Sequence, residues 1–217
     1  MSIAGVRPIA VQAVAFDLDD TLTDWWTGIE RAAAAVGAPE ILDRVREKTW
    51  VRRDGVVVDR HHWRLLHEPE TFMAAELVGP FLAALDPPLF DDVAPALDAL
   101  HGQVKLALLT NNPYGADVLD RYGLHVDVFD SVTIADPAVR KPDPRAFAPL
   151  VDALALAPSE IAFVGDSIPA DVEGALGAGL CAVWLNRWDD PWPVPPGVTA
   201  ITSLSELHAI SEEIRPC

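Results

Sequence analysis

The chain has few cysteines and no long hydrophobic run, and each absence excludes a class of protein. Its only two cysteines, Cys181 and Cys217, exclude a disulfide framework and a cysteine-rich metal site and suggest a reducing compartment. No apolar run approaches the ~18 residues that span a bilayer, and the N-terminus lacks the pattern of a signal peptide. We therefore expect a cytoplasmic protein with no membrane partner.

Basic residues are also scarce. Lysine and arginine number 16 against 33 aspartate and glutamate, which gives a formal net charge of -17. Such a charge repels nucleic acid and anionic membranes, so neither is expected as a partner. Only the segment 41–64 is locally basic. A small molecule is the expected partner, and the sequence leaves the oligomeric state open.

Hydrophobic residues, in contrast, make up 50% of the chain and are enough to bury a core. Five short apolar runs predict strands, at Ile9–Phe16, Val104–Leu109, Val126–Ile134, Ile161–Val164 and Cys181–Leu185. Helical patterns lie between them, at Val93–Leu100, Tyr114–Tyr122, Pro144–Leu156 and Pro169–Ala178. This alternation predicts an α/β fold with a parallel, doubly wound sheet.

The segment 24–88 interrupts the alternation, because it contains helical patterns without comparable strand runs. The expected helices are Trp25–Val36, Glu40–Arg53 and Thr71–Leu85. We therefore predict a core of residues 1–23 and 89–217 and an inserted helical domain of residues 24–88. A proline-dense surface loop is expected at 189–197.

Two carboxylates follow the first predicted strand. Asp17 and Asp19 would point to the same side of an extended chain, whereas Leu18 would not. Ligands bind at the carboxyl ends of strands in open α/β sheets, so this pair can address one ligand. Mutual repulsion of the carboxylates favours a bound cation or a shared proton. The alternative interpretation is a solvated acidic turn.

A second acidic pair, Asp166 and Asp171, follows the strand predicted at Ile161–Val164. Carboxylates that converge at strand ends supply the hard oxygen ligands that Mg²⁺ prefers. For Asp171 another role is equally open, because Pro169 suits the first position of a helix and an acid in the first turn complements the helix dipole.

Thr110 and Lys141 offer a hydroxyl and a positive charge to a phosphate group. Alone, each has a simpler explanation: Thr110 as a helix cap after a strand, and Lys141 as a solvated residue before Pro142. Their value comes from the combination with the two acidic pairs, since all four elements lie at or just after strand ends. Together they supply a nucleophile, an acid, a cation site, a hydroxyl donor and a fixed positive charge.

With this combination the sequence resembles the haloacid dehalogenase superfamily of hydrolases. The resemblance runs from Val14 to Asn186 and includes four motifs in the proper order. These motifs are Asp17-Leu18-Asp19-Asp20-Thr21-Leu22, Leu109-Thr110-Asn111, Lys141, and Gly165-Asp166-Ser167 with Asp171. The resemblance implies a Rossmann-like core with a helical cap inserted after the first motif, in agreement with the interruption at 24–88.

The resemblance further implies a phosphatase for a small phosphorylated metabolite such as phosphoglycolate, a sugar phosphate or a nucleoside monophosphate. Asp17 would attack the phosphate to form an aspartyl-phosphate, and Asp19 would act as general acid and then as general base. Mg²⁺ would be held by Asp17, the backbone carbonyl of Asp19, and Asp166. The implied phosphate ligands are Thr110, Asn111 and Lys141, with Asp171 supporting the metal or the lysine.

Two other functions are retained as alternatives. A 2-haloacid dehalogenase of this kind uses the same nucleophile but lacks an acid at the position of Asp19, and a catalytically idle relative would act as a binding protein. Phosphonate cleavage is less favoured, because no lysine of the insertion is clearly placed for a Schiff base.

Substrate choice is expected in the insertion. Its candidate residues are Trp25, Trp26, Arg52, Arg53 and Arg60, with His61, His62 and Trp63 beside them. The tryptophans have packing as their alternative role, and the arginines a solvated helix face.

Overall fold

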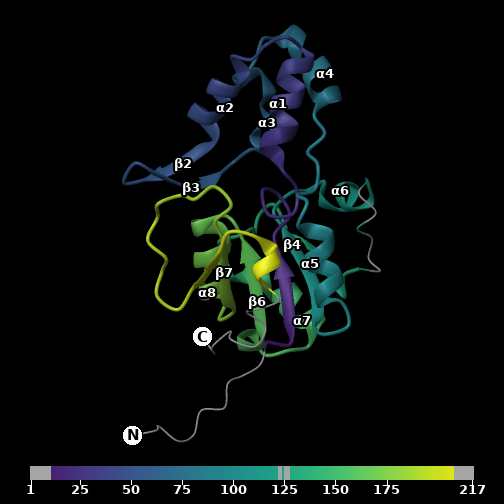
Figure 1. Cartoon of the computed structure of the whole chain (residues 1–217), viewed down its shortest axis with the longest axis vertical. Helices are drawn as coiled ribbons and strands as arrows, with labels where there is room; N and C mark the ends of the chain where they lie inside the picture. The colour runs from purple at the N-terminus through teal and green to yellow at the C-terminus, as the bar shows by residue number, and fades with distance from the viewer. Residues whose placement is uncertain (1–10, 122–123, 125–127, 208–217) are drawn as a thin grey trace, which may run out of the picture.

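The computed structural model describes residues 11–121, 124 and 128–207 of the chain (Figure 1). Its centre is a six-stranded sheet in the order β5-β4-β1-β6-β7-β8, in which every neighbouring pair is parallel. The strands are β1 (Ala13–Phe16), β4 (Lys105–Thr110), β5 (Ser131–Ile134), β6 (Ile161–Gly165), β7 (Cys181–Leu185) and β8 (Thr199–Ile201). The predicted α/β fold with a parallel sheet is confirmed.

The alternation of side chains along β1 explains why helices cover both faces of the sheet. Val14 and Phe16 belong to a buried cluster with α5 (Val93–Leu100) and α6 (Gly115–Arg121). Ala13 and Ala15 point the other way, into a cluster with α7 (Ala148–Leu154) and α8 (Gly174–Gly177). This is the doubly wound arrangement that the sequence predicts.

In the strand order, the direction in which successive strands are added to the sheet reverses at β1. From β1 the chain builds outward through β4 and β5 on one side, and then through β6, β7 and β8 on the other. Phe16 pairs with Leu108 of β4 and with Val164 of β6. The residues that follow these three strands therefore meet at one edge of the sheet, where open α/β folds bind ligands.

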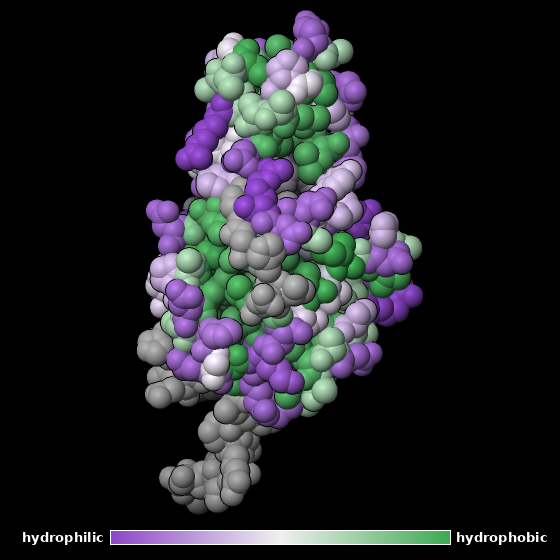
Figure 2. All heavy atoms as spheres, turned by 90° about the vertical axis from the view of Figure 1, so that its right-hand side faces the viewer, coloured by the Kyte–Doolittle hydropathy of each residue, from purple (hydrophilic) through white to green (hydrophobic). Residues whose placement is uncertain are grey.

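The segment between β1 and α5 forms the upper lobe of the molecule (Figures 1 and 2). It contains α1 (Trp25–Ala35), α2 (Ile41–Thr49), α3 (Arg64–His67) and α4 (Ala75–Ala84), which share a third buried cluster. The Asp24 carboxylate caps α1 by accepting a hydrogen bond from the Thr27 N–H at 2.9 Å. On the face with α4, hydrophobic residues gather between strips of hydrophilic ones (Figure 2).

One expectation for this segment is wrong, because a β-hairpin replaces the end of the helix predicted at 40–53. Helix α2 ends at Thr49, and β2 (Trp50–Arg53) pairs antiparallel with β3 (Val56–Arg60). Asp54 and Gly55 both adopt positive φ angles, 48° and 84°, as a two-residue hairpin turn of type I′ requires. This Asp-Gly turn and the β-branched run 56–58 outweigh the helical pattern.

Parts of the predicted elements fall on residues outside the description, among them Ile9, Tyr122 and Val126. Cys217 is also outside it, so the compartment inferred from the cysteines stays a prediction. Within the described ranges, no helix combines the length and apolar character needed to cross a membrane.

Candidate functional site

Lys141 lies at the centre of the polar residues at the strand ends. Its ammonium group is buried and donates hydrogen bonds to Asp17 Oδ1 at 2.5 Å, Asp171 Oδ1 at 2.7 Å and the Leu109 carbonyl at 3.1 Å. Burial by itself lowers the pKa of Lys141, but the two carboxylates outweigh this effect and raise it above its usual value. The lysine is thus a permanently charged group against Asp17.

Asn111 holds this lysine in place through the backbone. Its side-chain amide donates to the Lys141 carbonyl and accepts from the Lys141 N–H, both at 3.0 Å. The adjacent Thr110 hydroxyl is buried and accepts a hydrogen bond from the Asn112 N–H at 3.0 Å. The Thr110 hydroxyl proton and the second amide proton of Asn111 are therefore left to reach a ligand in the cavity that both residues line.

Three buried carboxylates, those of Asp17, Asp166 and Asp171, place oxygen atoms within 4.8 Å of one another. Burial raises the pKa of all three, and mutual repulsion adds to this increase for Asp17 and Asp166. Asp171 uses both of its oxygens, because Oδ1 accepts from Lys141 and Oδ2 from the Ser167 N–H at 3.0 Å. A divalent cation at Asp17 and Asp166 would relieve the repulsion, so this all-oxygen set fits Mg²⁺.

The glycine before Asp166 is required by this packing. A Cβ atom on Gly165 would lie 2.3 Å from the Asp171 carboxyl group, closer than any non-bonded contact allows. Residue 165 ends β6, where the backbone is fixed by the sheet. The absence of a side chain at this position thus lets Asp171 reach Lys141.

Asp19 is held apart from the other carboxylates. Its Oδ1 accepts hydrogen bonds from Trp25 Nε1 at 2.7 Å and from Asn112 Nδ2 at 3.2 Å. Burial raises the pKa of Asp19 to about 6, although the two hydrogen bonds oppose this shift. Asp19 is thus a half-buried carboxyl group of fixed orientation that exchanges a proton near neutral pH.

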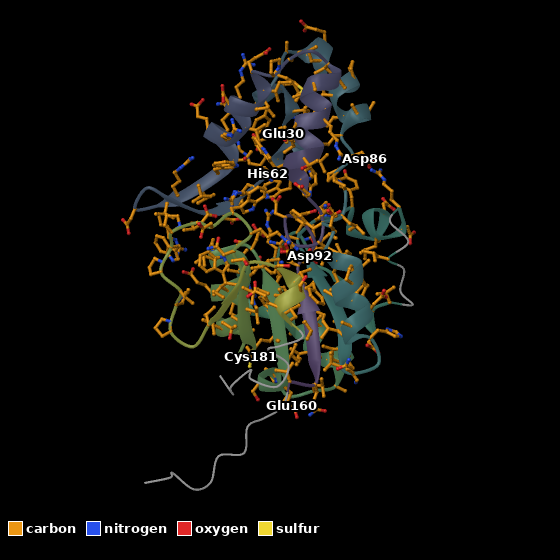
Figure 3. The ribbon with its side chains drawn as sticks, viewed as in Figure 1. Glu30, His62, Asp86, Asp92, Glu160 and Cys181 are labelled. Atoms are coloured by element: carbon orange, nitrogen blue, oxygen red, sulfur yellow. The ribbon has the colours of Figure 1, made fainter. Side chains whose placement is uncertain are left out.

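A buried pair joins the loop after β1 to the inserted segment. Asp20, whose φ angle is 59°, accepts a hydrogen bond from His62 Nδ1 at 2.7 Å, and both side chains are buried. Figure 3 shows His62 where the upper lobe meets the sheet. Sequence reasoning missed this pair and Asn112; the signals in the sequence are the adjacent third acid of the first motif and an asparagine just after a strand.

The five substrate-choice candidates of the insertion are not all at the site. A cavity of about 1100 Å³ above the carboxylates is lined by Arg53 and Arg60, but not by Trp25, Trp26 or Arg52. Trp25 instead contacts Asp19, and Trp26 donates to Glu30 at 2.6 Å. Both lining arginines are paired with the core, Arg53 with Glu173 and Arg60 with Asp190 at 2.8 Å.

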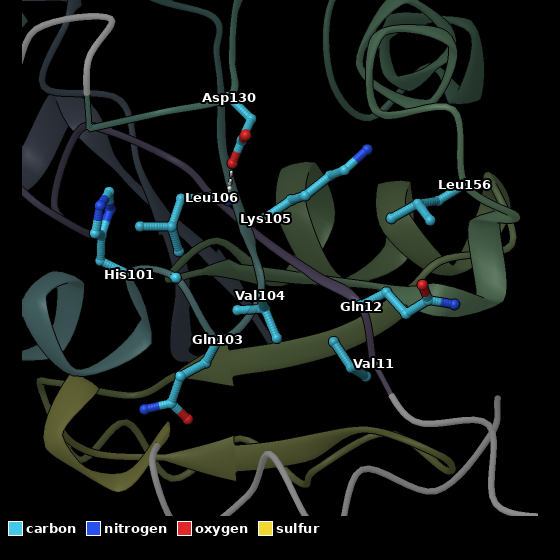
Figure 4. A pocket seen from close by; sticks show the side chains of 10 residues that line it. Val11, Gln12, His101, Gln103, Val104, Lys105, Leu106, Asp130 and Leu156 are labelled. Atoms are coloured by element: carbon cyan, nitrogen blue, oxygen red, sulfur yellow. Dashed lines mark hydrogen bonds between the residues drawn. The ribbon is translucent and has the colours of Figure 1, made fainter.

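A second cavity, of about 470 Å³, lies at the amino ends of β1 and β4 (Figure 4). Its charged groups have structural partners: Lys105 donates to the Leu154 carbonyl at 2.7 Å, and Asp130 accepts from the Leu106 N–H at 2.8 Å. Because this end of a parallel sheet is not where α/β folds bind ligands, we assign it no function.

Known proteins resemble the chain in sequence and in structure. A mouse N-acylneuraminate-9-phosphatase is 35% identical over 46% of this chain, and the match spans 41% of that enzyme's length. A phosphoglycolate phosphatase of Yersinia pseudotuberculosis is 33% identical over 82% of both chains. The L-2-haloacid dehalogenase of Xanthobacter autotrophicus shares the fold, with a TM-score of 0.71 and 21% identity over 94% of this chain and 99% of its own.

The family match covers the whole site. Residues 11–179, from just before β1 to beyond Asp171, match the haloacid dehalogenase-like hydrolases. That range is more than half of the 217 residues and includes every motif on which the sequence resemblance depends. The chain belongs to the haloacid dehalogenase-like hydrolase family.

Proposed function

We propose that this hydrolase is a Mg²⁺-dependent phosphatase that cleaves a small phosphorylated metabolite through an aspartyl-phosphate. The observation that carries the proposal is Asp19, a half-buried carboxyl group held by Trp25 and Asn112 two residues after Asp17. Cleavage of a phosphate ester needs an acid for the departing oxygen, and displacement of a halide does not. The phosphatases among its relatives lend support.

In the first step, an Asp17 oxygen forms a bond to phosphorus while the bond from phosphorus to the ester oxygen breaks. Asp19 gives its proton to that oxygen, so the leaving group departs as a neutral alcohol. In the second step, Asp19 takes a proton from water as the water attacks phosphorus and releases Asp17. The pKa of about 6 suits a group that must carry the proton in one step and lack it in the next.

The other residues of the site hold the phosphoryl group. The Lys141 ammonium, the Thr110 hydroxyl and the second amide proton of Asn111 would bind its oxygens, while Asp171 and the backbone contacts of Asn111 keep Lys141 in position. Asp17, Asp166 and the Asp19 backbone carbonyl would hold Mg²⁺. When bound, the ion would offset the negative charges that otherwise keep a carboxylate from approaching a phosphate.

Residues 24–88 are proposed to act as a cap domain over a core of residues 1–23 and 89–217. The lining of the large cavity supports this division, because it includes both Asp17 below and the β2–β3 hairpin above. A substrate enclosed between the two parts would be shielded from bulk water. Small metabolites fit such a site, whereas the surface of a phosphoprotein would not.

The test measures phosphate release from an aryl phosphate with and without Mg²⁺. Asp17→Asn should abolish release, and chelation should do so reversibly. Halide release from a 2-haloacid without added Mg²⁺ would instead support a dehalogenase. Undiminished phosphate release in Asp17→Asn would contradict the proposed nucleophile.

A further inference from the structure

The cavity above the carboxylates is much larger than a phosphate group needs. Its volume of about 1100 Å³ lies just above the roughly 300–1,000 Å³ typical of pockets for drug-sized ligands. A leaving group of two or three carbons would leave most of this space to water. The size therefore favours a leaving group that contains one or more rings.

Three rings of the inserted segment line this cavity. His61, Trp63 and His67, which we call the ring wall, follow one another with centroid separations of 5.8 and 5.6 Å. His67 is exposed and stacks on Tyr114 with ring centroids 6.4 Å apart, whereas Trp63 is half-buried and keeps part of its ring surface accessible. The three rings meet at angles of 41° and 69°, so a planar ring would stack on the face of one of them, and Trp63 offers the largest aromatic face.

The charges beside the ring wall disfavour a second anionic group. Asp59 lines the cavity with its carboxylate, which accepts from the Arg60 N–H at 2.7 Å and contacts His61 Nε2 at 2.9 Å. Of the lining lysine and arginine residues, all but Arg140 have a carboxylate partner within the described part of the chain. Arg140 itself is exposed and lies over the Trp63 ring at 5.7 Å.

We infer that the leaving group is a nucleoside, so that the substrate is a nucleoside 5′-monophosphate whose base stacks on the ring wall. The Asp59 carboxylate and the His61 imidazole offer hydrogen-bond partners to the sugar hydroxyls between the phosphate and the base. The inference rests on the proposed function, because it takes the phosphate to lie at Asp17. Under this inference Trp63, rather than Trp26 or Arg52, is the residue that selects the substrate.

The first experiment compares kcat/KM for uridine and adenosine 5′-monophosphates with that for ribose 5-phosphate, which lacks only the base. Stacking of a base on an aromatic side chain contributes about 1–3 kcal/mol, which corresponds to a factor of about 5–150. We expect at least one nucleotide to exceed ribose 5-phosphate by a factor in this range. Equal or faster turnover of ribose 5-phosphate would overturn the inference and leave the proposed phosphatase intact.

The second experiment assigns the effect to the ring wall. Trp63→Leu should reduce the ratio of nucleotide to ribose 5-phosphate kcat/KM by at least about 5-fold, and Trp63→Phe should restore part of it. Trp26→Leu is the matched control, because Trp26 belongs to the same segment but does not line the cavity. A ratio that falls equally in Trp63→Leu and Trp26→Leu would contradict a stacking role.

The remaining outcomes separate the two proposals. If 2-phosphoglycolate is the best substrate and Arg140→Gln removes that preference, Arg140 binds a carboxylate and the nucleoside inference is wrong. If no phosphate ester is turned over, the proposed function fails. In that case, calorimetric titration measures the affinity of Asp17→Asn for a nucleotide and for ribose 5-phosphate. If the base stacks on the ring wall, the variant should bind the nucleotide at least about 5-fold more tightly, and equal affinities would exclude the ring wall as a base site.

Discussion

Asp92 is expected to contribute more to stability than any exposed ion pair of this acidic chain. The residue lies just before α5, near the junction of the two lobes (Figure 3). It accepts two hydrogen bonds from Arg187, both at 2.9 Å, one from the Ser203 hydroxyl at 2.7 Å and one from the Leu204 N–H at 2.9 Å. Arg187 in turn donates to the Thr21 carbonyl at 2.9 Å. Asp92 thus ties α5 and the end of the sheet to the loop that carries Asp17 and Asp19.

The expected loss follows from the burial of this pair. The side chains of Arg187 and Asp92 are only 9% and 14% exposed. Removing one partner of a buried pair costs about 3–5 kcal/mol, and we take about 3 kcal/mol for Asp92→Asn because the pair keeps some access to water. With a urea m-value of about 2–3 kcal/mol/M, the unfolding midpoint should fall by roughly 1 M.

The assay is urea unfolding followed by circular dichroism at neutral pH. Asp43→Asn is the matched control, since Asp43 forms an ion pair with Arg46 but its side chain is 86% exposed; its loss should cost less than about 1 kcal/mol. If Asp92→Asn lowers the midpoint no more than Asp43→Asn does, the contacts of Asp92 are not what stabilises this junction.

Asp92 should also make the stability of the protein depend on pH, in a direction that follows from its pKa shift. Burial by itself raises the pKa of Asp92, but the hydrogen bonds from Arg187 and Ser203 outweigh it, so the pKa lies below its usual value. A lowered pKa contributes stability that is complete above the unfolded value of about 3.9 and is lost as the pH falls through the folded value. The stability difference between the wild type and Asp92→Asn should therefore shrink below about pH 4. A difference that grows with acidity would refute this assignment.

Two substitutions at other positions test the packing of the site. Gly165→Ala should lower the free energy of unfolding by about 1–3 kcal/mol, because the new methyl group overlaps the Asp171 carboxyl. The control is Gly79→Ala in α4, whose methyl group meets no atom within 4 Å and should be neutral or stabilising. Thermal unfolding compares the two variants, and equal effects would contradict the close contact at Gly165. Trp25→Phe keeps a six-membered aromatic ring but removes the N–H that donates to Asp19, so kcat for phosphate release should fall roughly 10-fold or more while KM changes less. An unchanged kcat would show that the hydrogen bond does not position the acid.

Much of the core could be predicted because its strands are long enough to leave a pattern. Apart from the exposed Lys105, the runs 104–109, 161–164 and 181–185 are apolar on both faces, as buried parallel strands must be, and each forms a strand of the sheet. Strand β8 was missed, since its three residues between a proline-dense loop and two serines show no periodicity. The β2–β3 hairpin was missed although Asp54-Gly55 marks its turn, because the helical pattern of 40–53 runs into its first strand.

In the site, the residues that follow strands could be predicted from the sequence, but the side-chain contacts between residues far apart in the sequence could not. Asp17, Thr110 and Asp166 meet because β1, β4 and β6 are neighbours, which strand-end reasoning anticipates. The contact of Asn112 with Asp19 spans 93 positions, and that of His62 with Asp20 spans 42. The His62 contact depends on how the insertion returns to the sheet, and the Asn112 contact depends on the path of the loop after β4; no local pattern records either geometry.

Because of the β2–β3 hairpin, the inserted segment cannot be separated from the rest of the chain as an independent unit. By position the hairpin belongs to the insertion, yet Val58 is buried in the same cluster as Phe163 and Leu150, with Val51 and Trp192 packed against that cluster. Excising residues 24–88 would thus remove a part of the hydrophobic cluster on the face of the sheet that carries α7 and α8. An exchange of insertions between relatives should keep residues 50–60 with the recipient and replace only the helices, because the unit that folds together does not end where the inserted sequence begins.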